Sequence, residues 1–536
     1  MFFREKKSGS RTYLQIVENR REEGKIKQRI IATLGRTDKL LESGNFDSLL
    51  LSGSKFSQAL VVISAHKRGK LPVLSTRRIG PSLIFERLWE ECGCKKIIKS
   101  LVNGRKFEFD VERALFLTVL HRIFESGSDR SANKWRLDYH IDGVEDLQLH
   151  HLYRAMAWLG EELPASTKDR FEELLFSIRR DLFTSLDLVF FDTTSIYFEG
   201  NGGSSLGEYG NSKDHRSDRK QLVVGAVLDD KGQPVCCEIL PGNTSDVRIL
   251  IPVVKRLKKR FGIKSICIVA DRGMVSADNT AMIEELGWRY ILGSRMRKQK
   301  VIGEKVLKRG GRYTIVHPKT KDGPSPLKVK EVKLDEGRFI ICFNEDQAKK
   351  DAESRKVIIE SLKNKLKKGE KALIGNKGYR RYLKVAHESF SLDDDKIKKE
   401  ALYDGKYVLT TNTTLDKAEV ALKYKQLWTV EDLFRRVKSY LKTRPVYHKC
   451  DETIKGHVFC SFLALVMMKT LENRLGKRGY KFEWSDIIRD LDSLEEIEIE
   501  HDGKRFFLRS EMTGNCSKIF QSVGIAIPKN LKQVDV

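Results

Sequence analysis

The hydrophobic positions between residues 186 and 297 predict strands and helices in a defined order. Short apolar runs of strand length come first, and Asp229-Asp230-Lys231-Gly232 joins two of them as a hairpin. Amphipathic helices with Ser, Thr or Asp caps follow, and one of them ends at Gly262. The predicted elements are the strands LDLVFF, QLVVGAVLDD and PVCCEILPG, the helix NTSDVRILIPVVKRLKKRFG with Thr244, Ser245 or Asp246 as its cap, the strand SICIVA, the helix SADNTAMIEELG and the strand WRYILGSRM. These elements form three antiparallel strands followed by helical crossovers to parallel strands.

The segments before this region predict a hairpin and then a set of helices. Residues 11–36 alternate like two strands around a Glu-Glu-Gly turn. From about residue 70 to 183 the period becomes helical, with a first helix beginning at Ser75 or Pro81. Arg and Lys lie on the outer faces of these helices, which suits DNA contact and equally suits a solvated helical bundle.

The pattern after Arg297 predicts an insertion and then a return to the core. KQKVIGEKVLKRGGRYTIV predicts a basic hairpin, LKVKEVKLDEGRFIICFN further strands, and AKKDAESRKVIIESLKNKLKK a long charged helix. Alternation returns at residues 405–412, residues 415–443 predict one strong helix, and GHVFCSFLALVMMKTLENRL an apolar helix against the sheet. The tail predicts a hairpin around Asp502-Gly503, flanked by the acidic EEIEIE.

The order of the elements in residues 186–297 resembles that of the ribonuclease H-like fold. We therefore predict an α/β protein: a ribonuclease H-like catalytic core, in which helices flank a mixed sheet, with an N-terminal helical domain and a β-rich insertion. A hundred residues is too long for a plain connection, which favours the insertion. The predicted division is an N-terminal hairpin and linker (1–70), a helical DNA-binding domain (71–183), the catalytic core (184–297 and 405–475), the insertion (298–404) and a C-terminal hairpin and tail (476–536).

The excess of basic over acidic residues predicts that the protein binds a polyanionic partner. The 536 residues carry 100 Lys and Arg against 74 Asp and Glu, a net charge of +26, which favours DNA or RNA. Residues 291–310 hold seven Lys or Arg and one Glu, so Arg297, Lys298 and Lys300 are predicted DNA contacts, with a charged surface hairpin as the alternative.

Leader, membrane and cysteine patterns point to a protein that acts inside the cell. MFFREKKSGS has no apolar core of signal-peptide length. The longest apolar run, FCSFLALVMM, is shorter than the about 20 residues that span a bilayer. Nine scattered cysteines favour reduced core residues over disulfides or zinc. We expect a cytoplasmic, nucleoid-associated protein with no membrane partner.

Asp192 stands in the apolar run LDLVFFDTTSIYFEG, where an unpaired charge is costly. Its carboxylate must be neutralised, paired or bound to metal, unless backbone amides satisfy it or the strand face turns outward. Asp271 ends the apolar strand SICIVA, the position at which open α/β sheets bind their ligands, although Asp before Arg-Gly is also a common turn choice.

A third carboxylate, Glu431, lies on the predicted helix 415–443. Tyr424, Glu431 and Lys438 are seven residues apart, so they project from one face of a continuous helix, flanked by Trp428 and Arg435. This set suits DNA phosphate held beside a metal, which makes Tyr424, Arg435 and Lys438 predicted DNA contacts. The alternatives are an exposed Glu–Arg pair, or a capping box at Thr429–Asp432 that breaks the helix.

Four segments resemble the DDE transposases of prokaryotic insertion sequences, in the superfamily named after insertion sequence four and closest to its subgroup with a long insertion before the catalytic Glu. They are YGNSKDHRSDRKQLVVGAVLD, LPGNTSDVRIL, ADRGMVSADN and YKQLWTVEDLFRRVKSYLKTRPVYHK, and the resemblance covers essentially the whole chain. The family's Tyr, Arg, Glu, Lys signature corresponds to Tyr424, Leu427, Glu431 and Lys438, so its Arg is missing here.

The resemblance implies that Asp192, Asp271 and Glu431 bind two Mg²⁺ ions, for which Mn²⁺ can substitute. Mg²⁺ prefers hard oxygen ligands, and two ions can serve an in-line phosphoryl transfer. The implied function is a transposase that binds the inverted-repeat ends of its element, cleaves there and joins the ends to target DNA, as a homodimer or larger assembly on paired ends. The alternatives are a ribonuclease H-like nuclease or resolvase, and a catalytically silent DNA-binding derivative.

Overall fold

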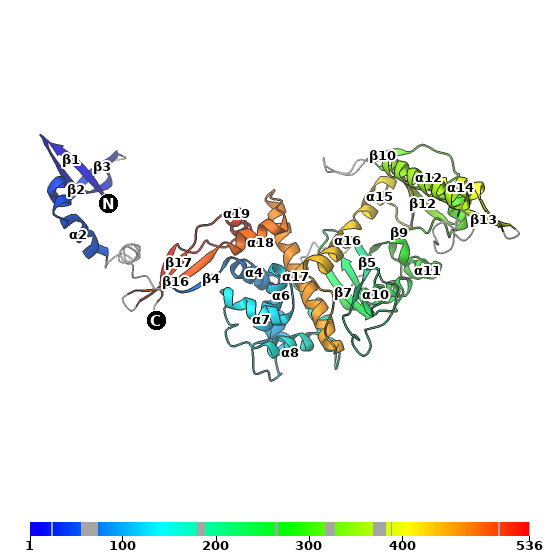
Figure 1. Ribbon diagram of the computed structural model, residues 1–536, viewed down its shortest axis with the longest axis horizontal. Helices are drawn as coiled ribbons and strands as arrows, with labels where there is room; N and C mark the ends of the chain where they lie inside the picture. The colour runs from blue at the N-terminus through cyan, green and yellow to red at the C-terminus, as the bar shows by residue number, and fades with distance from the viewer. Residues whose placement is uncertain are drawn as a thin grey trace. The chain divides into compact units, whose positions relative to one another are not determined.

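The computed structural model describes residues 1–22, 25–54, 73–179, 188–262, 266–316, 327–367, 382–386, 389–501 and 504–534 (Figure 1). The described residues fall into two compact units. The first unit contains Met1–Ile84, Leu137–Ile141 and Tyr480–Val536, and the second contains Phe85–Arg136 and Asp142–Gly479.

The chain begins with an antiparallel sheet of β1 (Phe2–Ser8), β2 (Arg11–Glu22) and β3 (Lys25–Arg36), followed by α1 (Thr37–Glu42) and α2 (Asn45–Ser54). The pairing of β2 with β3 confirms the predicted hairpin, whose turn residues 23 and 24 lie outside the described residues. The very N-terminus is therefore a sheet with two helices.

A second antiparallel sheet in the first unit has the order β18, β17, β16, β4. It joins β4 (Val73–Arg78) to the tail strands β16 (Glu495–His501), β17 (Lys504–Arg509) and β18 (Leu531–Val534). The predicted helical start at Ser75 is wrong, because β4 pairs with β16 and the Ser75 hydroxyl donates to Glu498 Oε2 at 3.0 Å. The tail hairpin is confirmed by its strand pairing, with residues 502 and 503 outside the described part.

Helices follow β4, beginning beside Pro81 as predicted. They are α4 (Gly80–Glu91), α5 (Cys94–Val102), α6 (Val111–Phe124), α7 (Asp129–Trp135), α8 (Leu149–Leu159) and α9 (Thr167–Arg179). Every residue of α6 is buried, and α17 (Asp451–Lys477) packs against α6, α8 and β7. By length and composition α17 could cross a membrane, but 83% of its apolar window is buried inside the protein, as in a core helix.

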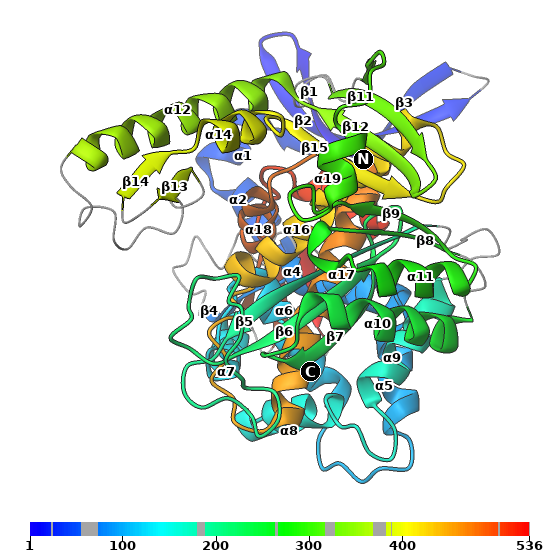
Figure 2. The ribbon, with the colours of Figure 1, turned by 90° about the vertical axis from the view of Figure 1, so that its right-hand side faces the viewer.

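The catalytic-core prediction concerned the large sheet, whose order is β10, β11, β12, β15, β9, β8, β5, β6, β7. β5 (Leu188–Tyr197), β6 (Gln221–Leu228) and β7 (Pro234–Pro241) are antiparallel, and β8 (Cys267–Ala270) and β9 (Arg289–Gly293) run parallel to β5. The crossovers are α10 (Asp246–Phe261) and α11 (Ala277–Glu285), shown in Figure 2. This confirms a mixed sheet flanked by helices.

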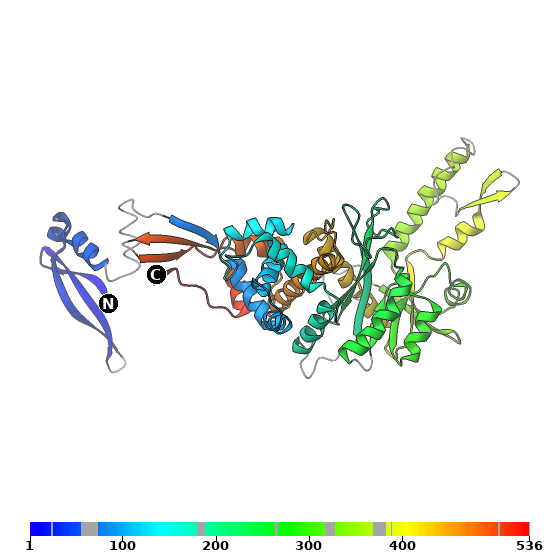
Figure 3. The same ribbon diagram turned by 90° about the horizontal axis from the view of Figure 1, so that it is seen from below.

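The segment predicted as an insertion extends the same sheet. β10 (Thr314–Val316), β11 (Leu327–Leu334) and β12 (Gly337–Phe343) lead to β15 (Lys406–Thr411), which pairs with β9. It also contains α12 (Glu345–Lys367) beside the hairpin of β13 (Leu383–Ala386) and β14 (Ser389–Leu392), and α14 (Asp394–Ala401) (Figure 3). The predicted basic hairpin is wrong at its start, because Ile302–Val306 is a helical turn that buries Ile302 and Val306.

The single helix predicted for residues 415–443 is also wrong. The chain forms α15 (Lys417–Lys425), α16 (Trp428–Arg435) and the π-helical turn η5 (Arg436–Tyr440). The interruption lies at Gln426 and Leu427, where backbone hydrogen bonds shorten to three-residue spacing. The alternative capping box at Thr429 does not form, because the Thr429 hydroxyl donates back to the Gln426 carbonyl oxygen. Tyr424 and Glu431 therefore lie on different helices.

Two glycines allow α17 to touch α8 through backbone atoms. A Cβ added at Gly456 would lie 2.0 Å from the Met156 carbonyl oxygen, and one added at Gly160 would lie 1.9 Å from the Glu452 carbonyl oxygen. Such distances are far below van der Waals contact, so a side chain at either position forces the two helices apart.

We predict that Gly456→Ala lowers the free energy of unfolding by about 1–3 kcal/mol, the usual effect of overpacking. Gly476→Ala is the matched control in the same helix, because an added Cβ there meets open space and helix propensity favours alanine by about 1 kcal/mol. Urea unfolding followed by circular dichroism compares the two variants. Equal stability of both variants contradicts the close contact.

Candidate active site

Asp192 and Asp271 lie level with each other on neighbouring parallel strands. The register of β5 and β8 pairs Phe190 with Val269 and Phe191 with Ala270, so the next pair in this register is Asp192 with Asp271. Level residues on parallel strands project from the same face of a sheet. The pairing of two strands therefore brings together carboxylates that are 79 residues apart in the chain.

The face on which the carboxylates project follows from the packing of their neighbours. Val189 and Phe191 belong to the core cluster formed with α10. Because side chains alternate along a strand, Asp192 projects from the opposite face. Helix α16 packs on β5 and β6, and its buried residues Val430, Leu433 and Phe434 are not in the α10 cluster. The helix that carries Glu431 thus covers the carboxylate face.

The Asp192 side chain is 18% exposed and has two stabilising partners. Its Oδ1 accepts a hydrogen bond from the Thr193 backbone N–H at 2.7 Å and lies 3.9 Å from Lys213 Nζ. Burial raises the pKa of the Asp192 carboxyl to about 6, and these two partners act in the opposite direction. The negative charges of Asp271 and Asp246 add to the rise, as expected for carboxylates that share one site.

Lys213 and Asp246 were not among the predicted site residues. Lys213 Nζ donates to the Thr193 carbonyl oxygen at 2.7 Å and to Thr193 Oγ1 at 2.8 Å, and lies 3.4 Å from Asp246 Oδ2. The Thr193 hydroxyl in turn donates to Asp246 Oδ1 at 2.6 Å. The available signal was that both residues stand in segments that carry the family resemblance, SKDHR and NTSD.

Tyr424 contacts Asp271 directly. The phenol donates to Asp271 Oδ1 at 2.9 Å, and burial raises the pKa of Tyr424, which keeps the phenol protonated as the donor. Gly293 makes room for this contact, because a Cβ there would lie 2.4 Å from the Tyr424 hydroxyl oxygen. Sequence reasoning placed Tyr424 on DNA, and this hydrogen bond gives it a partner within the protein.

Glu431 and Arg435 lie on the solvent side of α16. The Glu431 side chain is exposed, and no described residue makes a hydrogen bond or ion pair with it. Arg435 pairs with Asp432, so the alternative Glu431–Arg435 pair does not form. Glu431 is therefore available for a ligand.

Lys438 is held inside the protein. Its ammonium lies 2.7 Å from Asp214 Oδ1, and both side chains are at most 10% exposed. Arg444 pairs with the same oxygen. The predicted phosphate contact of Lys438 therefore requires this ion pair to open.

Comparison with protein families connects this geometry to known proteins. The Transposase DDE domain model matches residues 184–467, the part of the chain that holds all three carboxylates, and the model for the IS1634 family transposase, N-terminal domain, matches residues 3–65. The chain belongs to the DDE transposases of insertion sequences. A search of curated protein sequences gave no significant match. The core of the transposase is thus ribonuclease H-like, and its family uses a divalent metal.

Two groups of residues in the described part of the transposase could hold a divalent ion: the sheet face with Asp192 and Asp271, and a cluster that contains two histidines. The sheet face fits the ion better. Among the described residues, Asp129, His448 and His457 form a group whose ligand atoms lie within 4.8 Å of one another. His457 Nε2 faces the Thr443 carbonyl oxygen at 3.1 Å and must carry its hydrogen, so Nδ1 is the acceptor.

That acceptor is already used, because the Arg122 guanidinium donates to His457 Nδ1 at 2.9 Å. An arginine charge at the ligand atom opposes a cation, so this cluster does not fit a metal. Asp192 and Asp271 instead offer carboxylate oxygens, the hard ligands that Mg²⁺ prefers.

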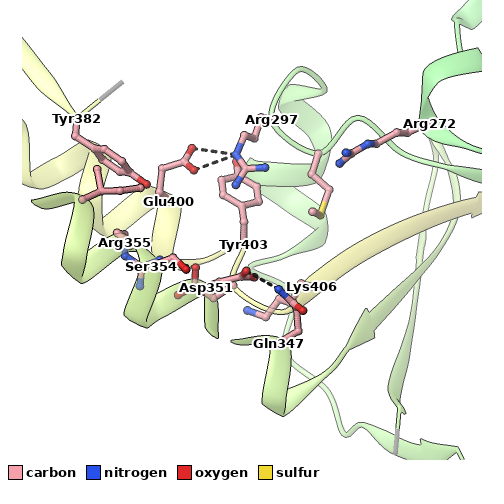
Figure 4. A pocket seen from close by; sticks show the side chains of 13 residues that line it. Arg272, Arg297, Gln347, Asp351, Ser354, Arg355, Tyr382, Glu400, Tyr403 and Lys406 are labelled. Carbon is pink, nitrogen blue, oxygen red and sulfur yellow. Dashed lines mark hydrogen bonds and ion pairs between the residues drawn. The ribbon is translucent and has the colours of Figure 1, made fainter. Parts of the chain in front are cut away.

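A cavity of about 450 Å³ lies between the insertion and the core, with Arg272 beside Asp271 on its wall (Figure 4). Arg297 pairs with Glu400 at 3.0 Å and lies over the Tyr403 ring, and Arg355 pairs with Asp404. The Arg297–Glu400 pair fastens α14 to the transposase core, the Arg355–Asp404 pair joins α12 to the end of the insertion, and both pairs occupy their arginines. The three predicted DNA contacts in this segment, Arg297, Lys298 and Lys300, are all exposed, and Arg297 has Glu400 as a partner.

We predict that Tyr424→Phe weakens binding of Mn²⁺, measured by calorimetry, and raises the Mn²⁺ concentration for half-maximal cleavage several-fold. The variant loses a hydrogen bond to a charged group, which contributes about 1.5–3 kcal/mol. End-DNA affinity stays unchanged, and Gly293→Ala, which displaces the Tyr424 hydroxyl, gives the same result.

Tyr407→Phe is the matched control, because the Tyr407 ring lies 5.8 Å from that of Tyr424 while its hydroxyl bonds Cys342. Weaker DNA binding by Tyr424→Phe with unchanged metal dependence would assign the residue to DNA contact instead.

Proposed function

We propose that the transposase binds the inverted-repeat ends of its insertion sequence, cleaves the DNA there and joins the ends to target DNA by two-metal phosphoryl transfer. The observation that supports this most is the level placement of Asp192 and Asp271, with the helix that carries Glu431 packed on the strand of Asp192. We assign Asp192, Asp271 and Glu431 as the catalytic Asp, Asp and Glu of the DDE site.

Asp192, Asp271 and Glu431 hold the metal in this proposal. Two Mg²⁺ ions, or Mn²⁺ in their place, activate the attacking oxygen and stabilise the leaving oxygen when bound. Tyr424 orients the Asp271 carboxylate, and the Lys213 ammonium keeps positive charge beside Asp192. Glu431 is the third ligand in this proposal; its exposed side chain stands on α16, the helix that packs on β5, and has to turn toward the two aspartates to share an ion with them.

DNA is the partner, both as transposon ends and as target. Arg435, which is 75% exposed at its side chain, and the exposed Lys298 and Lys300 are the cations best placed to contact backbone phosphates. Arg435, Arg297 and Lys438 each pair with a carboxylate. We place Arg297 and Lys438 second because their side chains are less exposed, 48% and 10% against 75% for Arg435. A homodimer or larger assembly on paired ends, acting in the cytoplasm on nucleoid DNA, completes the proposal.

Replacing Asp192, Asp271 or Glu431 by alanine should abolish strand cleavage and strand transfer and leave end binding within about two-fold, because each residue serves the metal. Asp432→Ala is a matched control on the same helix turn, since Asp432 pairs with Arg435 and Arg436. Gel-shift and cleavage assays on one preparation test this, and a strand-transfer product separates a transposase from a plain nuclease. Full activity in any of the three variants removes that residue from the site.

Salt dependence tests the contacts of the insertion. Each phosphate contact contributes about 0.9 to the slope of log K against log salt concentration. Lys298→Ala with Lys300→Ala should therefore reduce the slope by about 1.8. Arg297→Ala should change it less, because Glu400 already neutralises that charge. An unchanged slope in the double variant means that this segment does not touch DNA.

A further inference from the structure

The ammonium of Lys213 lies between two carboxylates. Its Nζ is 3.9 Å from Asp192 Oδ1 and 3.4 Å from Asp246 Oδ2. Both distances are longer than the about 2.7–2.9 Å of a charge-assisted hydrogen bond. The short hydrogen bonds of Lys213 go instead to Thr193, to the carbonyl oxygen at 2.7 Å and to the hydroxyl oxygen at 2.8 Å. An uncharged residue thus holds a positive charge between two negative ones.

The backbone that carries this ammonium is anchored. The Lys213 backbone N–H donates to Ser195 Oγ of β5 at 2.8 Å. The next residue, Asp214, is buried at its side chain and pairs with Lys438 and Arg444. The Lys213 side chain, in contrast, is 34% exposed and has a flexible stem of four carbons. The ammonium can therefore change partners while the loop stays in place.

Asp246 is placed to receive the ammonium. Its Oδ1 accepts a hydrogen bond from the Thr193 hydroxyl at 2.6 Å, and its Oδ2 faces Lys213. No other cation of the described residues pairs with Asp246. A small movement of Nζ, from 3.4 Å to the about 2.8 Å of a charge-assisted hydrogen bond, is enough to join the two groups.

A divalent ion on Asp192 would compete with Lys213 for the same carboxylate. Mg²⁺ binds carboxylate oxygens at about 2.1 Å. The ammonium already lies 3.9 Å from Asp192 Oδ1 and is the one cation among the described residues that pairs with this carboxylate. Two positive charges this close to one carboxylate repel each other. The repulsion falls when the ammonium moves toward Asp246.

We propose that Lys213 is a positioning residue that stands in for a divalent ion beside Asp192. Its ammonium neutralises the Asp192 and Asp246 carboxylates in the metal-free protein and moves onto Asp246 when a divalent ion binds. Lys213 therefore lowers the affinity for metal, and Asp246 offsets part of that effect. This proposal rests on the proposed function, in which Asp192 is a metal ligand.

Binding of Mn²⁺ to the full-length chain without DNA, measured by calorimetry, tests the proposal. Lys213→Gln should bind Mn²⁺ about tenfold more tightly than the wild type, because the competing charge is gone. Lys220→Gln is the matched control from the same loop between β5 and β6, since no described residue forms an ion pair with Lys220. It removes the same charge and should leave the Mn²⁺ affinity unchanged.

A double-mutant cycle tests the part of Asp246. Asp246→Asn should weaken Mn²⁺ binding several-fold in the wild-type background, because the ammonium then keeps only Asp192 as a carboxylate partner. In the Lys213→Gln background the same substitution should have little effect, since residues that act through each other are not additive. Equal losses in both backgrounds would make Asp246 a direct ligand and overturn the proposed transfer.

Thermal melts with and without Mn²⁺ verify folding. Mn²⁺ should raise the melting temperature of Lys213→Gln more than that of the wild type, because tighter binding stabilises the folded state more. A Lys213→Gln chain that folds only with Mn²⁺ supports the proposal as well. One that does not fold even with Mn²⁺ overturns it, because Lys213 then serves the fold.

Mn²⁺ affinity of Lys213→Gln equal to or below that of the wild type overturns the proposal. Lower affinity for end DNA at unchanged Mn²⁺ affinity does so too, and assigns Lys213 to a phosphate contact. Measurement without DNA keeps this test separate from the proposed function. Tighter Mn²⁺ binding by Lys213→Gln, when the wild type joins no DNA ends, supports the role of Lys213 and contradicts transposition. A lack of Mn²⁺ binding by both chains contradicts both proposals.

Discussion

The parallel pairing of β5 with β8 is the constraint on which the candidate active site depends. It sets Asp192 level with Asp271 in the middle of an apolar sheet. A shift of the register by one residue would turn one of the two carboxylates into the α10 core, where Phe191 and Ala270 now pack. The hydrophobic core on the α10 face therefore fixes the register, and the register fixes the chemistry on the other face.

Two carboxylates at this depth repel each other, and the surrounding residues offset that repulsion in different ways. Lys213 supplies a positive charge near Asp192, and Tyr424 supplies a neutral donor to Asp271. Neither partner closes the site, since Asp192 keeps part of its surface exposed. The arrangement holds the carboxylates in place and leaves oxygen atoms for a cation, which a full set of salt bridges would not do.

Local periodicity predicted much of the core from the sequence, because each strand and helix there is amphipathic or wholly apolar by itself. The order of β5 to β9, the Ser245 start of α10 and its Gly262 end all follow from such local signals. The break at Gln426 did not, because nothing in its own sequence interrupts the helical period. The strand β4 was missed because its partner, β16, is over 400 residues away in the chain.

The sequence predicted the carboxylates of the candidate site, but not the residues that pair with them. The sequence shows that an aspartate stands in an apolar strand, but it does not show which carboxylate forms an ion pair with a given Lys or Arg. Asp214 with Lys438, and Glu400 with Arg297, come from segments far apart in the chain, so their pairing required the fold. Because of these ion pairs, Lys438 and Arg297, both predicted DNA contacts, are less available to a DNA phosphate.

This pairing also changes what the net charge of +26 means. Many cations of the second unit are engaged by carboxylates, as in Arg113 with Glu112 or Arg260 with Glu172. Net charge favours a polyanionic partner, but the cations without carboxylates nearby determine where such a partner can bind. In the first unit, too, cations and carboxylates share a face of the β1–β3 sheet, where Arg20 pairs with Glu18. The positions at which a polyanion can bind therefore depend on how the fold pairs these charges, which the composition does not reveal.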